Sequence, residues 1–340
     1  MRPTLSTLTY VSNTVPARRT VMEHVRTNLS QLKEFTCSND SLYLYPADAL
    51  VDDFSDTILA LNNLTKCLNA SSMLRPDAVL HLSRIPHLSI LGVSIKNKNR
   101  DLWTNPHSGG FPALTHLILS VYTKEDGLSL GVQMLRTLSG LALTNLQIDL
   151  SVPSIRAEEY VDLISAIGRL RLLRDCQIVG SRLVGEPAHA AHAIDASALT
   201  PLHALSDMRH FHQMSIPVAF QPESARQLAA AWPRLEELSI RASSGERRLY
   251  RELRRNDLLA LARSCPSAEA LAVAAHPVRE NRAYDASAVE HAPSAPNQFG
   301  LGGPDSSIRI VDGVALRLGQ IFSATRLEDD WVEVERPDAE

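Results

Sequence analysis

The stretch FPALTHLIL, residues 111–119, decides how this sequence is interpreted, because its apolar pattern returns along the chain. The same phrase occurs as LSILGVSI at 88–95 and as WPRLEELSI at 232–240. One such unit is too small to bury its own apolar residues, but a stack of units builds a continuous core. The sequence therefore predicts a repetitive architecture.

Each phrase ends in an alternation of variable and apolar residues. We place a register mark on the apolar residue that comes just before the last such alternation. The marks are Leu8, Phe35, Cys67, Leu91, Leu117, Leu146, Cys176, Met214, Leu238 and Leu271, with a weaker mark at Leu327. The first ten marks are 24 to 38 residues apart. Leucine-rich repeats are roughly 20–29 residues long, so most gaps lie at or slightly above that range. We predict an α/β leucine-rich-repeat solenoid with a parallel concave sheet and convex helices.

The segments between the phrases carry the helices that this architecture requires. Leu128, Val132, Leu135 and Leu138 have a helical spacing. Pro16 and Pro76 suit helix starts, and Asp257 is a good N-cap. The predicted helices are Val15–Leu29, Asp77–Ser83, Leu128–Leu138, Ala157–Leu170, Ser224–Trp232 and Asp257–Ser264.

The chain divides into three parts on this interpretation. Residues 1–277 form an array of about ten units, interrupted by an insertion at Gly180–Thr200. Residues 278–307 are rich in Pro, Gly, Asn and Ser and are expected to be a disordered or long-loop insertion. Residues 308–340 are expected to hold a helix, a partial last repeat and an acidic tail. The strand phrase at Leu5–Tyr10 has no capping segment before it, so we expect an array that lacks its N-terminal cap, as in a truncated product.

The composition excludes several classes of protein. The 340 residues carry a formal net charge of -4, which argues against a nucleic-acid-binding protein. No apolar run is long enough for a transmembrane helix, so no membrane partner is expected. The four cysteines form no C-x-x-C pair, and Cys37, Cys67 and Cys176 occupy apolar positions of the repeat. We expect buried free thiols and a reducing location, cytoplasmic or nuclear.

The order of several phrases resembles fungal F-box proteins with leucine-rich repeats. The resemblance rests on the segments 74–88, 257–266 and 314–322 and on Trp331-Val332-Glu333-Val334. In that family the repeats select the substrate of a cullin-type ubiquitin ligase, and an N-terminal F-box docks onto the ligase adaptor. The chain has no Leu-Pro-x-Glu opening and no paired helices before the first repeat. The resemblance therefore implies a substrate-recognition fold, with the adaptor as a partner only if an F-box lies upstream.

The sequence carries no recognisable catalytic or cofactor motif. Neither a G-x-S-x-G elbow nor a G-x-G-x-x-G or Walker loop is present, so we expect no catalytic residue and no cofactor. A histidine group is interpreted as solvated surface rather than as a metal site; its members are His189, His192, His203, His210 and His212. The arginines at 247, 248, 251, 254 and 255 are interpreted as a solvated helix face, with contact to an acidic partner as the alternative.

The concave strand face remains the best candidate for a binding site. Side chains alternate along each strand between the core and this face. The candidates are Thr36, Ser94, Ser120, Gln147, Asp149, Gln177, Ser215, Ser239 and Arg241. We expect a non-enzymatic, monomeric module that binds an unknown protein substrate through this face. The alternatives are a stand-alone scaffold or truncated fragment without a ligase link, and a hydrolase whose site lies in the insertions.

Overall fold

The computed structural model describes just over half of the chain in terms of helices, strands and turns. The described residues are 5–11, 14–38, 50–69, 74–95, 110–121, 127–138, 140–150, 155–180, 194–214, 218–219, 222–241, 270–274 and 298–302. The chain is an α/β protein with parallel sheets and helices. It divides into two units, one containing residues 1–155 and 165–173 and the other residues 156–164 and 174–340. Among the described residues, none of the helices has the length and apolar character needed to span a bilayer.

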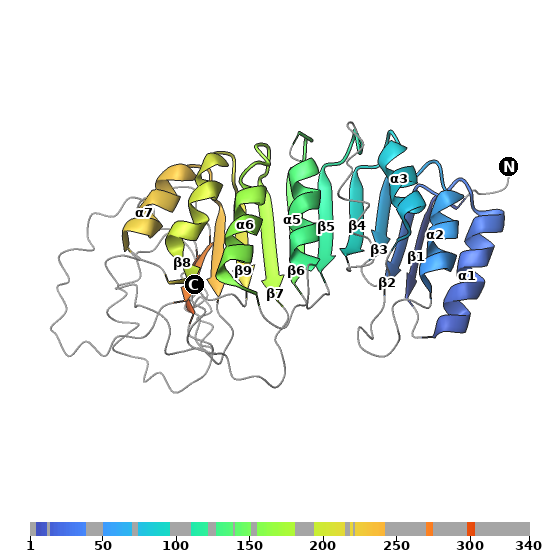
Figure 1. Ribbon diagram of the computed structural model, residues 1–340, viewed down its shortest axis with the longest axis horizontal. Helices are drawn as coiled ribbons and strands as arrows, with labels where there is room; N and C mark the ends of the chain where they lie inside the picture. Colours follow the sequence, from blue (N-terminus) through green and yellow to red (C-terminus); the bar gives the residue numbers. More distant parts are fainter. Residues whose placement is uncertain are drawn as a thin grey trace, which may run out of the picture. The chain divides into compact units, whose positions relative to one another are not determined.

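Six parallel strands in sequence order form the sheet of the first unit (Figure 1). They are β1 Thr7–Val11, β2 Glu34–Ser38, β3 Lys66–Asn69, β4 Ile90–Ile95, β5 His116–Val121 and β6 Asn145–Leu150. The six predicted marks of this unit are register partners in one row, which confirms them: Leu8, Phe35, Cys67, Leu91, Leu117 and Leu146. From Phe35 to Leu146 the row is buried, as is the parallel row of Val93, Leu119 and Ile148.

A ladder of hydroxyl groups connects neighbouring strand segments just before β3, β4, β5 and β6. The side-chain hydroxyl of Thr65 donates to the carbonyl of Lys33 at 3.1 Å, and Ser89 donates to Thr65 at 3.1 Å. Thr115 donates to Ser89, and Thr144 to Thr115, both at 3.2 Å. Each of the same carbonyls also accepts two backbone N–H groups from the segment that precedes the next strand. Because each rung stands two residues before a register mark, the ladder fixes the strand register.

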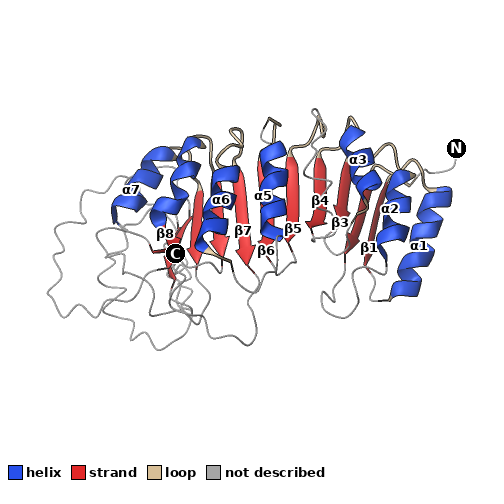
Figure 2. Ribbon diagram, viewed as in Figure 1, coloured by secondary structure: helices blue, strands red, loops and turns tan. Residues whose placement is uncertain are grey.

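Helices cover one face of this sheet (Figure 2). They are α1 Val15–Asn28, α2 Val51–Leu59, α3 Pro76–Arg84 and α5 Gly127–Thr137. Proline occupies the first turn of α1 and of α3, as predicted. Helix α2 was not predicted; it buries Phe54 and Ile58, and the ring of Phe54 stacks on Phe35 with centroids 5.5 Å apart.

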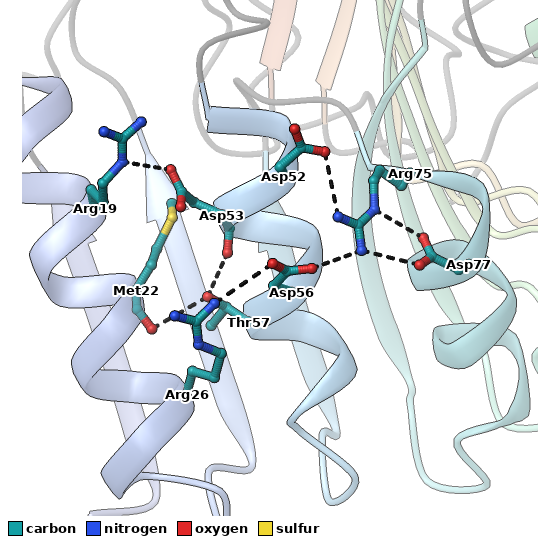
Figure 3. A network of polar contacts seen from close by, with 9 residues as sticks. All are labelled: Arg19, Met22, Arg26, Asp52, Asp53, Asp56, Thr57, Arg75 and Asp77. Atoms are coloured by element: carbon teal, nitrogen blue, oxygen red, sulfur yellow. Dashed lines mark hydrogen bonds and ion pairs between the residues drawn. The ribbon is translucent and has the colours of Figure 1, made fainter.

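The first three helices are joined by ion pairs that alternate in sign from helix to helix (Figure 3). Arg19 of α1 contacts Asp53 of α2 at 2.9 Å. Arg75, which precedes α3, contacts Asp56 of α2 at 2.7 Å and Asp77 at 3.1 Å. Beneath them the buried hydroxyl of Thr57 donates to the carbonyl of Met22 at 3.3 Å. These contacts set the spacing of the helix layer.

Five parallel strands form the sheet of the second unit, in the order β7, β9, β11, β12, β13. They are β7 Asp175–Gly180, β9 His210–Met214, β11 Glu237–Arg241, β12 Ala270–Ala274 and β13 Gln298–Gly302. Cys176, Phe211, Leu238 and Leu271 are register partners, and Phe299 continues their row. The predicted mark at Met214 is therefore wrong, since Phe211 holds that position.

The helical elements of this unit are α7 Pro222–Ala231 and a 3₁₀ helix, η4 Ala196–Ala204, together with the first part of α6 Ala157–Ile167. Asp195 caps η4 by accepting from the Ser197 N–H at 2.8 Å, and this backbone contact lowers the pKa of the Asp195 carboxyl. Two short strands, β8 Ile194–Asp195 and β10 Val218–Ala219, pair in parallel. The indole of Trp232 packs on Phe211 and donates to the carbonyl of Leu202 at 3.0 Å.

Two of the predicted insertions contain ordered elements. The last residues of Gly180–Thr200 form β8 and the start of η4. Strand β13 lies inside the segment 278–307, so that five of its residues are a sheet strand and not a loop. The predicted helix Asp257–Ser264, the weak mark at Leu327 and the whole of 308–340 lie outside the described residues.

Candidate interaction surface

The sheet face opposite the helices is called here the open face. It consists of the strand residues that alternate with the buried core rows, as the burial of β6 shows: Leu146, Ile148 and Leu150 are buried, while Asn145, Gln147 and Asp149 are partly exposed. All five predicted positions of the first unit lie on this face: Thr36, Ser94, Ser120, Gln147 and Asp149.

Three of these side chains form one polar cluster. The amide nitrogen of Gln147 donates to the two carboxylate oxygens of Asp149 at 3.1 and 3.4 Å. The Ser120 hydroxyl, on the neighbouring strand, donates to the same carboxylate at 3.5 Å. Ser94 and Ser120 are only 5% and 1% exposed, so the prediction that they form a solvent-facing surface is wrong. Their side chains are too short to project beyond larger neighbours such as Ile118 and Asp149.

In the second unit the corrected register changes which residues share the open face. Gln177, His212 and Ser239 are register partners in one row. The predicted Ser215 followed from the wrong mark at Met214; His212 stands in its place, and Ser215 itself lies outside the described residues. Arg241 ends β11 in register with Met214, and its side chain lies outside the described part. Ser239 is 2% exposed, which again contradicts the predicted exposure.

A chain of charged groups runs across the strand starts of this unit. His210 bridges two carboxylates: its Nδ1 contacts Asp175, and its Nε2 lies 3.3 Å from Glu236. The other oxygen of Glu236 accepts from Arg209 at 3.2 Å. All four side chains are between a third and a half exposed. The sequence indicated only that His210 and His212 share a strand face; their acidic partners come from other strands and could not be paired before the register was known.

The second histidine forms a looser contact. His212 Nε2 lies 3.5 Å from Glu237, whose side chain is 43% exposed. Ser239, the register partner of His212, has a buried hydroxyl that forms no hydrogen bond. This part of the open face thus combines an accessible carboxylate, an imidazole and an unsatisfied hydroxyl.

The histidines do not converge as metal ligands within the part of the chain that the structure describes. His203 lies in η4, away from the open-face strands, and burial lowers its pKa. His189, His192 and the arginine run at 247–255 lie outside the described residues. The predicted buried thiols are confirmed: Cys37, Cys67 and Cys176 are free and buried, and Cys265 is not among the described residues.

Comparison with known proteins assigns the chain to no family. No family model matches it, and no curated protein sequence does. Among solved structures it is similar to a mutant O-GlcNAc hydrolase from Thermobaculum terrenum at 12% sequence identity, with a TM-score of 0.19, over 68% of this chain and 58% of that chain. The chain therefore spans less than two thirds of that protein's length. A TM-score this low carries no argument about fold or function, so the residues themselves carry the interpretation.

Proposed function

We propose that the chain is a leucine-rich-repeat solenoid that recognises another protein through the open face. The observation that carries this proposal is the contrast between the two faces of the sheet. One face is buried under helices, whereas the other holds accessible charged groups such as Asp175, His210 and Glu237. Repeat proteins commonly bind through an extended strand face of this kind.

The hydroxyl ladder supports the repeat interpretation. Thr65, Ser89, Thr115 and Thr144 each repeat one side-chain-to-carbonyl contact at the same position before successive strands. A bond that recurs at four successive steps is expected where each repeat contacts only its neighbours. The link to a ubiquitin ligase rests on the resemblance to F-box proteins alone, and a stand-alone scaffold is the alternative. In either case we propose a non-catalytic module.

The test is affinity capture of the full chain from native-like lysate, followed by mass spectrometry. An open-face variant carries Asp149→Lys and Glu237→Lys, one substitution in each unit. A matched helix-layer control carries Glu23→Lys and Glu158→Lys, which change the net charge equally at exposed positions of α1 and α6. Circular dichroism verifies that both variants fold.

We expect the wild type and the helix-layer control to capture the same proteins and the open-face variant to lose them. An unchanged set with the open-face variant would contradict the proposal. Adaptor and cullin among the captured proteins would favour the ligase link. Specific partners without them would favour the scaffold.

A further inference from the structure

Two groups of polar side chains on the open face of the second unit differ in how completely their members are in contact with one another. In the first group, Arg209, Glu236, His210 and Asp175 form a continuous chain of contacts. The positive charge of Arg209 is neutralised there by Glu236. This group is satisfied internally, and a ligand would have to break existing contacts to bind it.

The second group, formed by Glu237, His212 and Ser239, is incomplete. The contact between His212 and Glu237 is 3.5 Å long, which is too long for a strong hydrogen bond. Ser239 is 2% exposed, and its hydroxyl has no hydrogen-bond partner. A buried hydroxyl without a hydrogen-bond partner destabilises the folded chain, which suggests that Ser239 is retained for another reason.

The positions of these residues bring the unsatisfied groups to one place. Glu237 and Ser239 are two residues apart on β11 and therefore point to the same side. His212 lies beside Ser239 on the adjacent strand β9. The arrangement joins an accessible carboxylate to a hydroxyl oxygen with free lone pairs, and both are acceptors for N–H donors.

We propose that Glu237, Ser239 and His212 bind a lysine or arginine side chain from an extended segment of the partner protein. The ligand's N–H groups donate to the Glu237 carboxylate and to the Ser239 oxygen, and the ammonium or guanidinium replaces the long contact from His212. Charge complementarity selects a cation, because the carboxylate repels an anionic segment. This inference rests on the proposed function, in which the open face binds a protein.

The test uses fluorescence anisotropy with the full chain and a fluorescein-labelled, alternating Ser-Arg peptide. A citrulline analogue of the peptide keeps its shape and removes its charge. The chain variants are Glu237→Gln, Ser239→Ala and the control Glu223→Gln. The control removes one exposed carboxylate of α7 in the same unit, so it has the same effect on net charge.

We expect Glu237→Gln to weaken binding of the Ser-Arg peptide about tenfold, since a charge-assisted hydrogen bond is lost. Glu223→Gln leaves the affinity unchanged, and the citrulline peptide fails to bind. Ser239→Ala weakens binding severalfold while raising the melting temperature of the free chain, because it removes the unsatisfied hydroxyl. A purely structural serine would change the melting temperature without changing the affinity.

Several outcomes would overturn the site: no binding by the wild type, equal losses with Glu237→Gln and Glu223→Gln, equal binding of the citrulline peptide, or an affinity unaffected by Ser239→Ala. Each can occur while capture of partners still depends on the open face. In that case the cation site fails and the proposed function stands. If peptide binding does not depend on Glu237 and capture of partners does not depend on the open face, the proposed function fails as well.

Discussion

At the scale of single residues, a buried polar pair occupies a place where the neighbouring strands carry isoleucine. Gln213 of β9 is in register with Ile178 and Ile240, and it is 0% exposed. The Tyr160 hydroxyl donates to its side-chain oxygen at 2.6 Å. Burial raises the pKa of Tyr160 well above its ordinary value, so the hydroxyl remains a donor at all physiological pH values.

We therefore predict that Tyr160→Phe lowers the free energy of unfolding by about 1–3 kcal/mol, because it removes the donor and leaves a buried acceptor. Urea denaturation measures the loss. Adding Gln213→Met to this variant should restore part of the stability, since it removes the buried amide oxygen that accepted from Tyr160. Equal stability of Tyr160→Phe and the wild type would show that the pair contributes nothing.

The buried cysteines give a second prediction at this scale. Burial raises the pKa of Cys67 and of Cys176 to about 12. Because the thiolate is the reactive form, iodoacetamide should modify neither residue at neutral pH in the native chain. Peptide mapping after alkylation, with and without urea, measures this. Rapid native modification of Cys67 would show that the sheet core opens readily.

At the scale of elements, the contact between α2 and α3 depends on Arg75. Its hydrogen bond to Asp77 lowers the pKa of that carboxyl. A carboxyl with a lowered pKa stabilises the fold above its ordinary pKa of about 3.9, and this contribution is lost as the pH falls through the lowered value. The groups are largely exposed, so Arg75→Gln should cost no more than about 1 kcal/mol at pH 7.

The difference between Arg75→Gln and the wild type should shrink as the pH falls below about 4. Thermal unfolding followed across this range measures it. Arg19→Gln, which removes an ion pair between α1 and α2, is the control, because it leaves the contact between Arg75 and Asp77 in place. A difference that stays constant down to low pH would contradict the assigned cause.

The elements also show why some features could be predicted from the sequence and others could not. Apolar periodicity located the six strands of the first unit, because the marks are register partners in one row, which is buried from Phe35 to Leu146. The phrase in β9 was misplaced because Gln213 stands where the pattern requires an apolar residue. Its partner Tyr160 is 53 residues away, and local spacing cannot reveal it. Helix α2 was missed because an apolar residue, Leu50, precedes it and no proline marks its first turn, whereas proline marks the first turns of α1 and α3.

At the scale of the whole molecule, each strand pairs only with its neighbours, and this determines how far the effect of a destabilising substitution extends. Each strand bonds to the strands beside it, and the hydroxyl ladder connects the segments that precede β3, β4, β5 and β6. In such arrays stability is approximately the sum of terms from single repeats and from contacts between neighbours. The candidate site shares this property, since its residues belong to adjacent strands of one unit. A distant core defect should leave that site formed.

We predict that Leu117→Ala and Leu238→Ala each lower stability by about 2–5 kcal/mol, since both side chains are buried in the same type of core row. Native-state hydrogen exchange should separate the two variants. Leu117→Ala accelerates exchange most in β4, β5 and β6, whereas Leu238→Ala accelerates it most in β9, β11 and β12. Each substitution serves as the control for the other because their chemistry is identical. If hydrogen exchange is accelerated uniformly across both units, the chain unfolds as one cooperative body, which would contradict the repeat interpretation. If the acceleration is confined to the strands around each substitution, it matches an array in which each repeat is stabilised by its neighbours.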